Sequence, residues 1–384
     1  MNLFNLLKQE LKAIFSNSAI LLTVFGGVVF YSFLYPLPYA SQTPKEQKVI
    51  VVNLDNSLLS YQLERMVDAT PDINVVSRTH SIELAKEGVI QGNASGILVI
   101  PNHFYRDLLL GKSPTLSYAG DASYFLVYGT IVKGLASVGG TVAAKVKISQ
   151  LLSEGEPLVL AKTQFAQIST NMKPTFNPTN GYINYVVPAV FVLILQQTLV
   201  MGIGLLGGTE KSQSGYWRQC PTIKLLSVRC FIFLCIYYVL ALYYFGFSFD
   251  FYGINLLASP IDLLFLLLPF LLTSCFIGIV LGALLPRREL VTLVVLISSM
   301  PLIFSAGFIW PLESIPQPMI WLSNLFPSTP AMQAFLSVNQ MGATLSQIIE
   351  QSRLLWLQSL GWGIIAYFTY SHVQGRVRAL GIGE

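Results

Sequence analysis

Charge is scarce in this sequence. Asp, Glu, Lys and Arg make up only 11% of its 384 residues, whereas soluble globular chains carry about 25% charged residues. Hydrophobic residues reach 53%, so neither a wholly soluble single domain nor a disordered chain is expected. No run of Lys and Arg is present that would suit a nucleic-acid backbone, so nucleic acid is not an expected partner.

Cysteine and histidine are also few. No two cysteines have the C-x-x-C spacing, and the histidines are scattered, so neither a zinc site nor any other bound metal is expected. The cysteines all lie after residue 219, in apolar sequence, where small buried side chains are the ordinary interpretation. These residues are Cys220, Cys230, Cys235 and Cys275, with His80, His103 and His372.

The charges that are present are unevenly placed. Residues 41–180 hold 12 Lys or Arg and 11 Asp or Glu, while the other 244 residues share 19 charges. Within this polar segment, short apolar runs typical of strands alternate with helical patterns, which predicts a small α/β domain. The predicted strands are 49–53, 73–76, 96–100 and 115–118, and the predicted helices are 58–69, 81–91 and 104–110, followed by long helices from 124 to about 170.

The remainder of the chain contains six apolar stretches near the roughly 20 residues that cross a bilayer as a helix. A signal peptide is the alternative for the first stretch, but that run exceeds the usual length and lacks an A-x-A site. Before it, residues 1–16 alternate apolar residues with Lys8, Glu10 and Lys12, a pattern typical of an amphipathic interfacial helix. The predicted spans are 17–37, 182–206, 225–247, 261–285, 290–310 and 354–372.

The positions of Lys and Arg predict the orientation of these spans, because basic loops stay in the cytoplasm. Basic residues occur in four regions that alternate correctly with the spans: 1–16, 207–224, 286–289 and the residues after 372. The loops on the other side contain a single basic residue, Arg353. The expected fold is an α-helical polytopic membrane protein with six transmembrane helices and cytoplasmic termini. An α/β extracytoplasmic domain (41–180) is inserted between spans one and two.

No catalytic constellation is evident. Gly111-Lys112-Ser113 has the ending of a phosphate-binding loop, but Arg106 stands where that loop needs its first glycine, and a predicted helix precedes it instead of a strand. Charged residues are absent from the centres of the spans, so an ion-coupled carrier would lack its usual titratable groups. An enzyme acting alone is therefore not expected, nor is a cofactor bound by this chain.

Neutral polar residues do occur within the spans. They are candidates for lining a transport pathway, although interhelical hydrogen bonding is an alternative that the sequence leaves open. Later in the chain, small residues and prolines interrupt apolar sequence and predict an extracytoplasmic re-entrant segment at 311–353. The pathway candidates are Gln196, Gln197, Ser298 and Ser299.

The proline-rich stretch resembles the signature of ABC-2 type transporter permeases, S-G-x-x-x-P-x-x-x-[ML]-P followed by a P-x-x-P-like element. Residues 51–60 and 100–108 also resemble V-D-x-D-x-S-x-x-S and I-P-x-x-F-x-x-D-L, two elements of the long-ectodomain, inner-membrane exporter permeases of this family. The similarity covers nearly the whole chain. The matching signature residues are Ser305, Gly307 (with Ala306 inserted), Pro311, Glu313, Pro316, Pro327 and Pro330.

The resemblance implies the permease subunit of an exporter in the bacterial inner membrane. Such permeases move a drug, lipid or other amphiphile and lack an ATPase site, so ATP and Mg²⁺ are expected on separate cytoplasmic ABC ATPase subunits. A second permease copy, identical or paralogous, and membrane lipid are implied partners, and a periplasmic adaptor would suit the outer domain. A membrane-anchored receptor or scaffold, whose outer domain binds a partner, is the alternative function.

The resemblance also implies that the cytoplasmic loop 207–224 couples the permease to the ATPase. Family members often carry E-[KR]-E-x-G-[ST] there. In this chain Ser212 replaces the second Glu and Gly215 falls one place late, so a merely solvated loop is the alternative. The predicted coupling residues are Thr209, Glu210, Lys211, Ser212 and Gly215.

Overall fold

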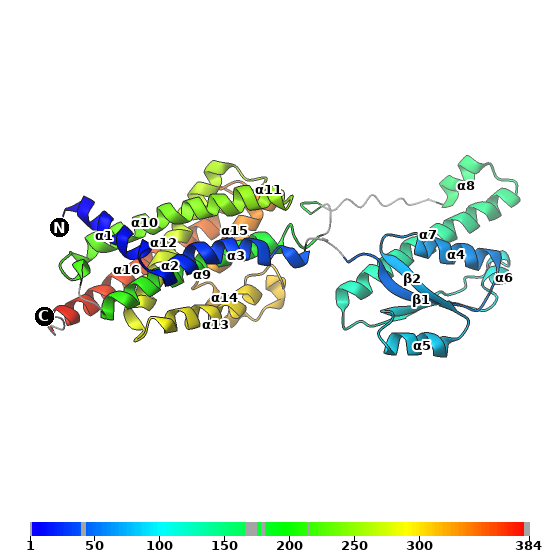
Figure 1. The fold of residues 1–384 in the computed structure, drawn as a ribbon. Helices are drawn as coiled ribbons and strands as arrows, with labels where there is room; N and C mark the ends of the chain where they lie inside the picture. Colours follow the sequence, from blue (N-terminus) through cyan, green and yellow to red (C-terminus); the bar gives the residue numbers. More distant parts are fainter. Residues whose placement is uncertain (1, 40–43, 166–174, 178–180, 213–214, 380–384) are drawn as a thin grey trace. The chain divides into compact units, whose positions relative to one another are not determined.

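The computed structural model describes residues 2–39, 44–165, 175–177, 181–212 and 215–379. The chain divides into two compact units, which are described separately (Figure 1). The helical unit comprises Met1–Gln42 and Pro174–Glu384, and the α/β unit comprises Thr43–Lys173. The polar segment identified in the sequence thus corresponds closely to the α/β unit.

The α/β unit contains a four-stranded mixed sheet with the strand order β2-β1-β3-β4. Strand β1 pairs in parallel with β2 and β3, and β4 runs antiparallel to β3. The central strand is apolar on both faces because Val49 and Val51 enter one core while Ile50 and Val52 enter another. The strands are β1 (Gln47–Asn53), β2 (Ile73–Thr79), β3 (Gly96–Ile100) and β4 (Ser117–Gly120).

Helices cover both faces of this sheet (Figure 1). On one face, Leu63, Phe104 and Val138 share a core with β1, and they come from α4, α6 and α7 respectively. On the other face, Ala85 of α5 packs with Ile50. The bounds are α4 (Leu58–Asp68), α5 (Ile82–Ile90), α6 (Phe104–Leu109), α7 (Phe125–Ser153) and α8 (Leu158–Phe165).

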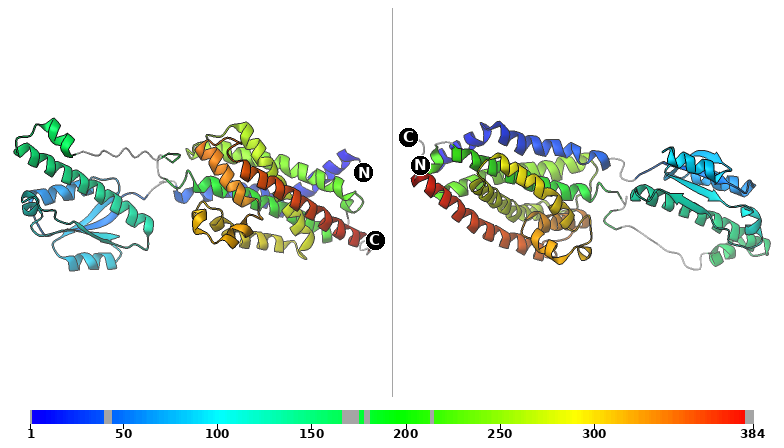
Figure 2. Two further views of the ribbon diagram at one scale, coloured as in Figure 1. Left: turned by 180° about the vertical axis from the view of Figure 1, so that it is seen from behind. Right: turned by 90° about the horizontal axis from the view of Figure 1, so that it is seen from below.

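The helical unit is built from long apolar helices. Residues 18–34 form one continuous helical run with a π-helical turn at 22–26, and α10 continues through a second π-helical turn into α11. Figure 2 shows α16 running the length of this unit. The elements are α1 (Leu3–Phe15), α2 (Ser18–Leu21), η1 (Leu22–Gly26), α3 (Gly27–Leu34), η2 (Leu37–Tyr39), α9 (Val186–Ser212), η3 (Tyr216–Arg218), α10 (Thr222–Leu242), η4 (Tyr243–Ser248), α11 (Phe249–Phe251), α12 (Pro260–Leu284), α13 (Glu289–Ser305), η5 (Leu312–Ser314), α14 (Gln317–Ser323), α15 (Ser328–Met341) and α16 (Ile349–Ala379).

Helix α9 lies at the centre of the helical unit and packs against α12, α13 and α15. Its contact with α12 is close because glycines face each other there. A Cβ atom added at Gly282 would lie 2.9 Å from the carbonyl oxygen of Gly204, and one at Gly278 would lie 3.0 Å from that of Val200. Small residues that allow such backbone approach are typical of helix interfaces in membranes.

Among the described residues, five helices are long and apolar enough to cross a membrane, and four of them overlap the predicted spans 17–37, 182–206, 225–247 and 261–285. The other two predicted spans remain predictions. Helix α13 (Glu289–Ser305), which overlaps the predicted span 290–310, is a shorter apolar helix of 17 residues, and α16, which contains 354–372, is not among the five. The fifth candidate is α7 of the α/β unit, one face of which packs on the sheet.

Helices form in both segments that the sequence placed between spans, the coupling segment 207–224 and the re-entrant segment 311–353. In the segment 207–224, α9 continues to Ser212, η3 follows, and α10 begins at Thr222. In the segment 311–353, α14 and α15 form, and most of α15 is buried against α9, α12 and α16.

Candidate functional site

A cluster of buried charged side chains lies where α9 ends. We call it the ionic cluster, and its members come from α1, α9, η3, α10 and α16. Arg229 is only 1% exposed, Glu10 is fully buried, and Glu210 is 8% exposed. The ionic cluster consists of Glu10, Glu210, Tyr216, Arg229 and Tyr370.

Arg229 is the centre of the ionic cluster. Its Nε donates to Glu10 Oε2 at 3.1 Å, its Nη2 donates to Glu10 Oε1 at 2.7 Å, and its Nη1 donates to Glu210 Oε2 at 3.0 Å. One guanidinium therefore bridges two carboxylates from helices far apart in the sequence. Buried charges are tolerated only when they are paired and hydrogen-bonded in this manner.

Two tyrosine hydroxyls complete the shell around the carboxylates. Tyr216 donates to Glu10 Oε1 at 2.9 Å, and Tyr370 donates to Glu210 Oε2 at 3.1 Å. Burial, followed by the neighbouring Glu10 carboxylate, raises the pKa of Tyr216, which lies between α9 and α10. The phenol therefore stays protonated and keeps its proton available for Glu10.

Helix α1 places Glu10 in this site through its spacing. Leu6, Glu10 and Ile14 follow at intervals of four residues and form the buried face of the helix. The sequence pattern had placed Glu10 on the polar face of an interfacial helix, and that placement is wrong, because its carboxylate is buried. Asn17 then begins α2 by accepting a hydrogen bond from the backbone N–H of Ala19 at 3.1 Å, which turns the chain at the end of α1.

The predicted coupling residues lie mainly on the last turn of α9. Glu210 faces inward and pairs with Arg229, so its carboxylate is not displayed on an exposed loop. Lys211 Nζ donates to the carbonyl oxygen of Leu285 at 2.9 Å, at the end of α12. Thr209 Oγ1 accepts from Asn17 Nδ2 at 3.5 Å, and so links α9 to the corner between α1 and α2.

The other two predicted coupling residues contribute less to the described structure. Ser212 is the last residue of α9, and its side chain lies outside the described part. Gly215 precedes η3 in an extended conformation. The structure thus brings Thr209, Glu210 and Lys211 together on one helix end that contacts both the corner between α1 and α2 and the end of α12.

Five residues that build this end of the helical unit were not predicted as site residues from the sequence: Glu10, Tyr216, Arg229, Tyr370 and Gln374. Arg229 was used only to orient a span, although a single Arg inside an otherwise uncharged apolar helix is itself a signal of a buried partner. Gln374 Nε2 donates to the carbonyl oxygen of Cys220 at 3.0 Å, and its Oε1 accepts from Thr222 Oγ1 at 2.6 Å. It therefore holds the segment between α9 and α10 against α16.

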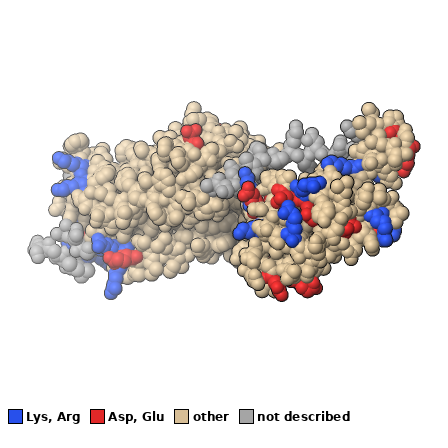
Figure 3. Space-filling model, turned by 45° about the vertical axis from the view of Figure 1, so that its right-hand side comes forward, with Lys and Arg blue, Asp and Glu red and all other residues tan. Residues whose placement is uncertain are grey.

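A cavity of about 400 Å³ opens beside the ionic cluster. The corner between α1 and α2, the end of α9 and η3 form its walls, with Glu210, Tyr216 and Arg288 among the lining residues. On the face shown in Figure 3, the Lys and Arg residues of the helical unit gather at the left-hand end of this unit, and its middle is almost uncharged. The site thus combines a polar cavity with paired buried charges.

The pathway candidates fall into two groups. Gln197 Nε2 donates to Ser299 Oγ, which joins α9 to α13, and Ser298 and Ser299 both donate to the carbonyl oxygen of Val295. The bond from Gln197 to Ser299 is the interhelical bonding that the sequence left open as an alternative, whereas the two serine bonds to Val295 stay within α13. Gln196 differs, because it is buried and its Oε1 has no hydrogen-bond partner among the described residues.

The signature residues turn the chain between α13 and α15. Ser305 Oγ donates to the carbonyl oxygen of Pro301 at 2.6 Å near the end of α13. Gly307 has φ +85°, and a Cβ atom there would lie 2.7 Å from Leu312, so glycine is required at this turn. The prolines and the acidic residue follow at helix ends: Pro311 and Glu313 at η5, Pro316 before α14, and Pro327 and Pro330 at the start of α15.

These features define an integral membrane protein in which several long apolar helices accompany an α/β unit. The chain belongs to the ABC-2 family of transporter proteins, whose sequence pattern matches residues 18–368. The match spans nearly the whole chain and confirms the family inferred from the signature residues. The protein is therefore a membrane permease of an ABC transporter. A comparison with curated proteins finds no match.

Proposed function

We propose that this permease belongs to an exporter that moves a drug, lipid or other amphiphile out of the cytoplasm or the inner membrane. A separate ATPase subunit, which binds ATP and Mg²⁺, supplies the energy. The observation that carries the proposal is the ionic cluster, because it joins four helices of the membrane permease at one end, next to a polar cavity.

The proposed topology has six spans, with both termini in the cytoplasm and the α/β unit outside a bacterial inner membrane. Its support is the alternation of basic regions along the sequence. The ionic cluster then lies at the cytoplasmic end of the spans. Two permease copies work with two ATPase subunits, and the α/β unit is where a periplasmic adaptor would bind.

In this mechanism the ionic cluster transmits movement instead of contacting the ATPase. Arg229 binds α1 through Glu10 and α9 through Glu210, so a displacement of either helix end is passed to α10. Tyr370 extends the same connection to α16. The ATPase docks on the surface around the cavity, where Asn17 and Arg288 are found.

The test measures ATP turnover and transport together. The permease and the ATPase that co-purifies with it are placed in vesicles, and translocation of a fluorescent lipid is measured per ATP hydrolysed. Glu210→Gln weakens the pairing with Arg229, so we expect fewer lipids moved per ATP. Glu350→Gln, which changes an exposed carboxylate in the first turn of α16, is the matched control. An unchanged ratio in Glu210→Gln would exclude the coupling role.

A further inference from the structure

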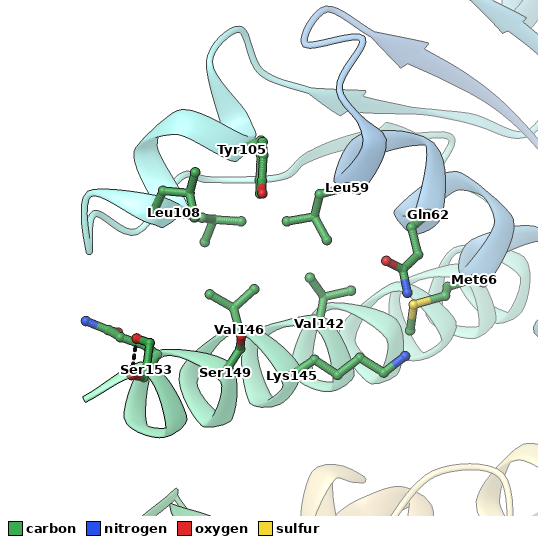
Figure 4. Close-up of a pocket in the computed structure, with 12 residues that line it drawn as sticks. Leu59, Gln62, Met66, Tyr105, Leu108, Val142, Lys145, Val146, Ser149 and Ser153 are labelled. Carbon is green, nitrogen blue, oxygen red and sulfur yellow. Dashed lines mark hydrogen bonds between the residues drawn. The ribbon is translucent and has the colours of Figure 1, made fainter. Parts of the chain in front are cut away.

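A groove of about 420 Å³ lies in the α/β unit, between α4, α6 and α7 (Figure 4). Leu59 and Leu108 face Val142 and Val146 across it, and these four residues form an apolar floor. The volume lies within the range of roughly 300–1,000 Å³ that is typical of small-molecule sites. A groove of this size suits one small ligand better than a long protein segment.

The groove stays open because of how its three helices pack. Helix α4 packs against both α6 and α7. Ile131, Val138 and Val142 of α7 belong to the core on the sheet, and the same helix lines the groove from Val142 to Ser153. Leu59 of α4 and Leu108 of α6 pack against that core and also line the groove.

Polar groups line the groove on one helix face. On α7, residues 142, 145, 146, 149, 150 and 153 follow the spacing of a single helical face. Val142 and Val146 supply apolar surface, and Ser149 and Gln150 supply hydrogen-bonding groups at the rim. The groove thus has an apolar floor with a polar edge, as amphiphile sites require.

Lys145 is the one charged residue among those that line the groove. Its side chain extends from α7 toward the end of the groove where Gln62 and Met66 lie (Figure 4). It is exposed, and it forms no ion pair within the part of the chain that the structure describes. The acidic residue of α6, Asp107, is already paired with Arg106 and Lys112.

We propose that this groove binds an anionic, single-chain amphiphile. The acyl chain lies against Leu59, Leu108 and Val146, and the carboxylate lies beside Lys145. A cation at the edge of an apolar groove favours an anionic head group over a cationic one. The proposal rests on the proposed function for its biological meaning, since it names the amphiphile class that the exporter would handle outside the membrane. Its test, however, is independent of transport.

The experiment uses the full-length protein in lipid nanodiscs. A diazirine-bearing palmitate is the anionic probe, and a diazirine-bearing hexadecyltrimethylammonium is the matched cationic probe. After irradiation, mass spectrometry locates the labelled peptides. We expect palmitate to label peptides containing 59–66, 105–109 and 142–153 in preference to the cationic probe. Equal labelling by both probes, or no labelling of these peptides, would overturn the proposal.

Substitutions on α7 distinguish the effect of charge in the groove from a general effect on folding. Lys145→Glu should lower palmitate labelling about fivefold or more, because it replaces attraction with repulsion at a partly screened site. Lys145→Arg should retain labelling. Lys147→Glu makes the same charge change at an exposed position on the same helix outside the groove, and should also retain it. If Lys145→Glu and Lys147→Glu reduce labelling equally, the assigned site is wrong.

A third variant tests the apolar floor. Val146→Trp fills the groove, so labelling of its peptides by palmitate should fall while the thermal unfolding midpoint stays close to that of the parent protein. Unchanged labelling would contradict binding at this position. If palmitate does not label the groove, the lipid-per-ATP ratio of Glu210→Gln still tests the proposed function. If that ratio is unchanged, the labelling experiment still tests whether the groove binds an anionic amphiphile. The two proposals therefore fail independently.

Discussion

Arg229 and Glu10 lie 219 positions apart in the sequence, and their side chains form two hydrogen bonds inside the helical unit. This pair attaches the first helix of the chain to α10. The same guanidinium also binds Glu210, so the end of α9 becomes part of one connected group. Such a pairing makes the positions of α1, α9 and α10 interdependent.

Removing Arg229 alone should destabilise the helical unit strongly. Arg229→Met leaves two carboxylates buried without their cation, and breaking a buried ion pair in this way costs about 3–5 kcal/mol. The thermal unfolding midpoint of the detergent-solubilised protein should therefore fall markedly. Adding Glu10→Gln and Glu210→Gln to the same chain should recover much of the loss, since no charge then remains unpaired. A triple variant as unstable as the single one would contradict this account.

Gln374 should be required to keep the segment between α9 and α10 in place. Gln374→Leu removes the hydrogen bonds to Thr222 and to the carbonyl oxygen of Cys220, and unpaired buried groups cost about 1–3 kcal/mol. Cys220, which is buried in the parent protein, should then react faster with maleimide. The measurement uses a Cys235→Ser background, because Cys235 is exposed. Unchanged labelling of Cys220 would show that other contacts hold this segment.

The close approach of α9 and α12 should not tolerate a larger residue. In Gly282→Ala, the new methyl group would lie 2.9 Å from the carbonyl oxygen of Gly204, so the helices must separate. Overpacking of this kind costs about 1–3 kcal/mol. Gly361→Ala on α16 is the control, because nothing lies within 4 Å of its added Cβ atom and alanine favours helix. The prediction fails if both variants have the thermal unfolding midpoint of the parent.

The stability of residues 47–79, near the start of the α/β unit, should depend on Asn53. Its Nδ2 donates to Glu64 Oε1 at 2.6 Å and to Ser60 Oγ at 3.0 Å, and its Oδ1 accepts from the backbone N–H of Asn56 at 3.0 Å. Asn53→Leu leaves buried polar groups unpaired, so we expect a loss of about 3 kcal/mol. Hydrogen exchange in residues 47–79 of the full-length protein should become faster.

An exposed asparagine provides the control for this experiment. Asn93 is bonded to the side chain of Gln91 at the surface, so Asn93→Leu should leave the exchange of residues 47–79 unchanged. Equal acceleration in both variants would point to a general effect of the substitution. Equal protection in both would show that Asn53 does not hold the end of β1.

Local patterns in the sequence were sufficient for much of the fold. Charge density separated the segment 41–180 from the apolar remainder, and length with apolarity located the helices that begin the helical unit, because both signals act over adjacent residues. The alternation of strand and helix patterns predicted long helices from residue 124 within the polar domain, where α7 lies. Its composition resembles that of a membrane span, yet one of its faces packs on the sheet of the α/β unit.

The candidate site depended on contacts that no local pattern contains. A family resemblance pointed to Glu210, but the cluster around it also takes residues 10, 229 and 370, and only folding brings these together. The groove beside Lys145 arises in the same way, because α6 and α7, which are distant in the sequence, both pack against α4. Hydrophobicity and charge along the chain thus specify which segments are buried, whereas the three-dimensional packing specifies which side chains meet.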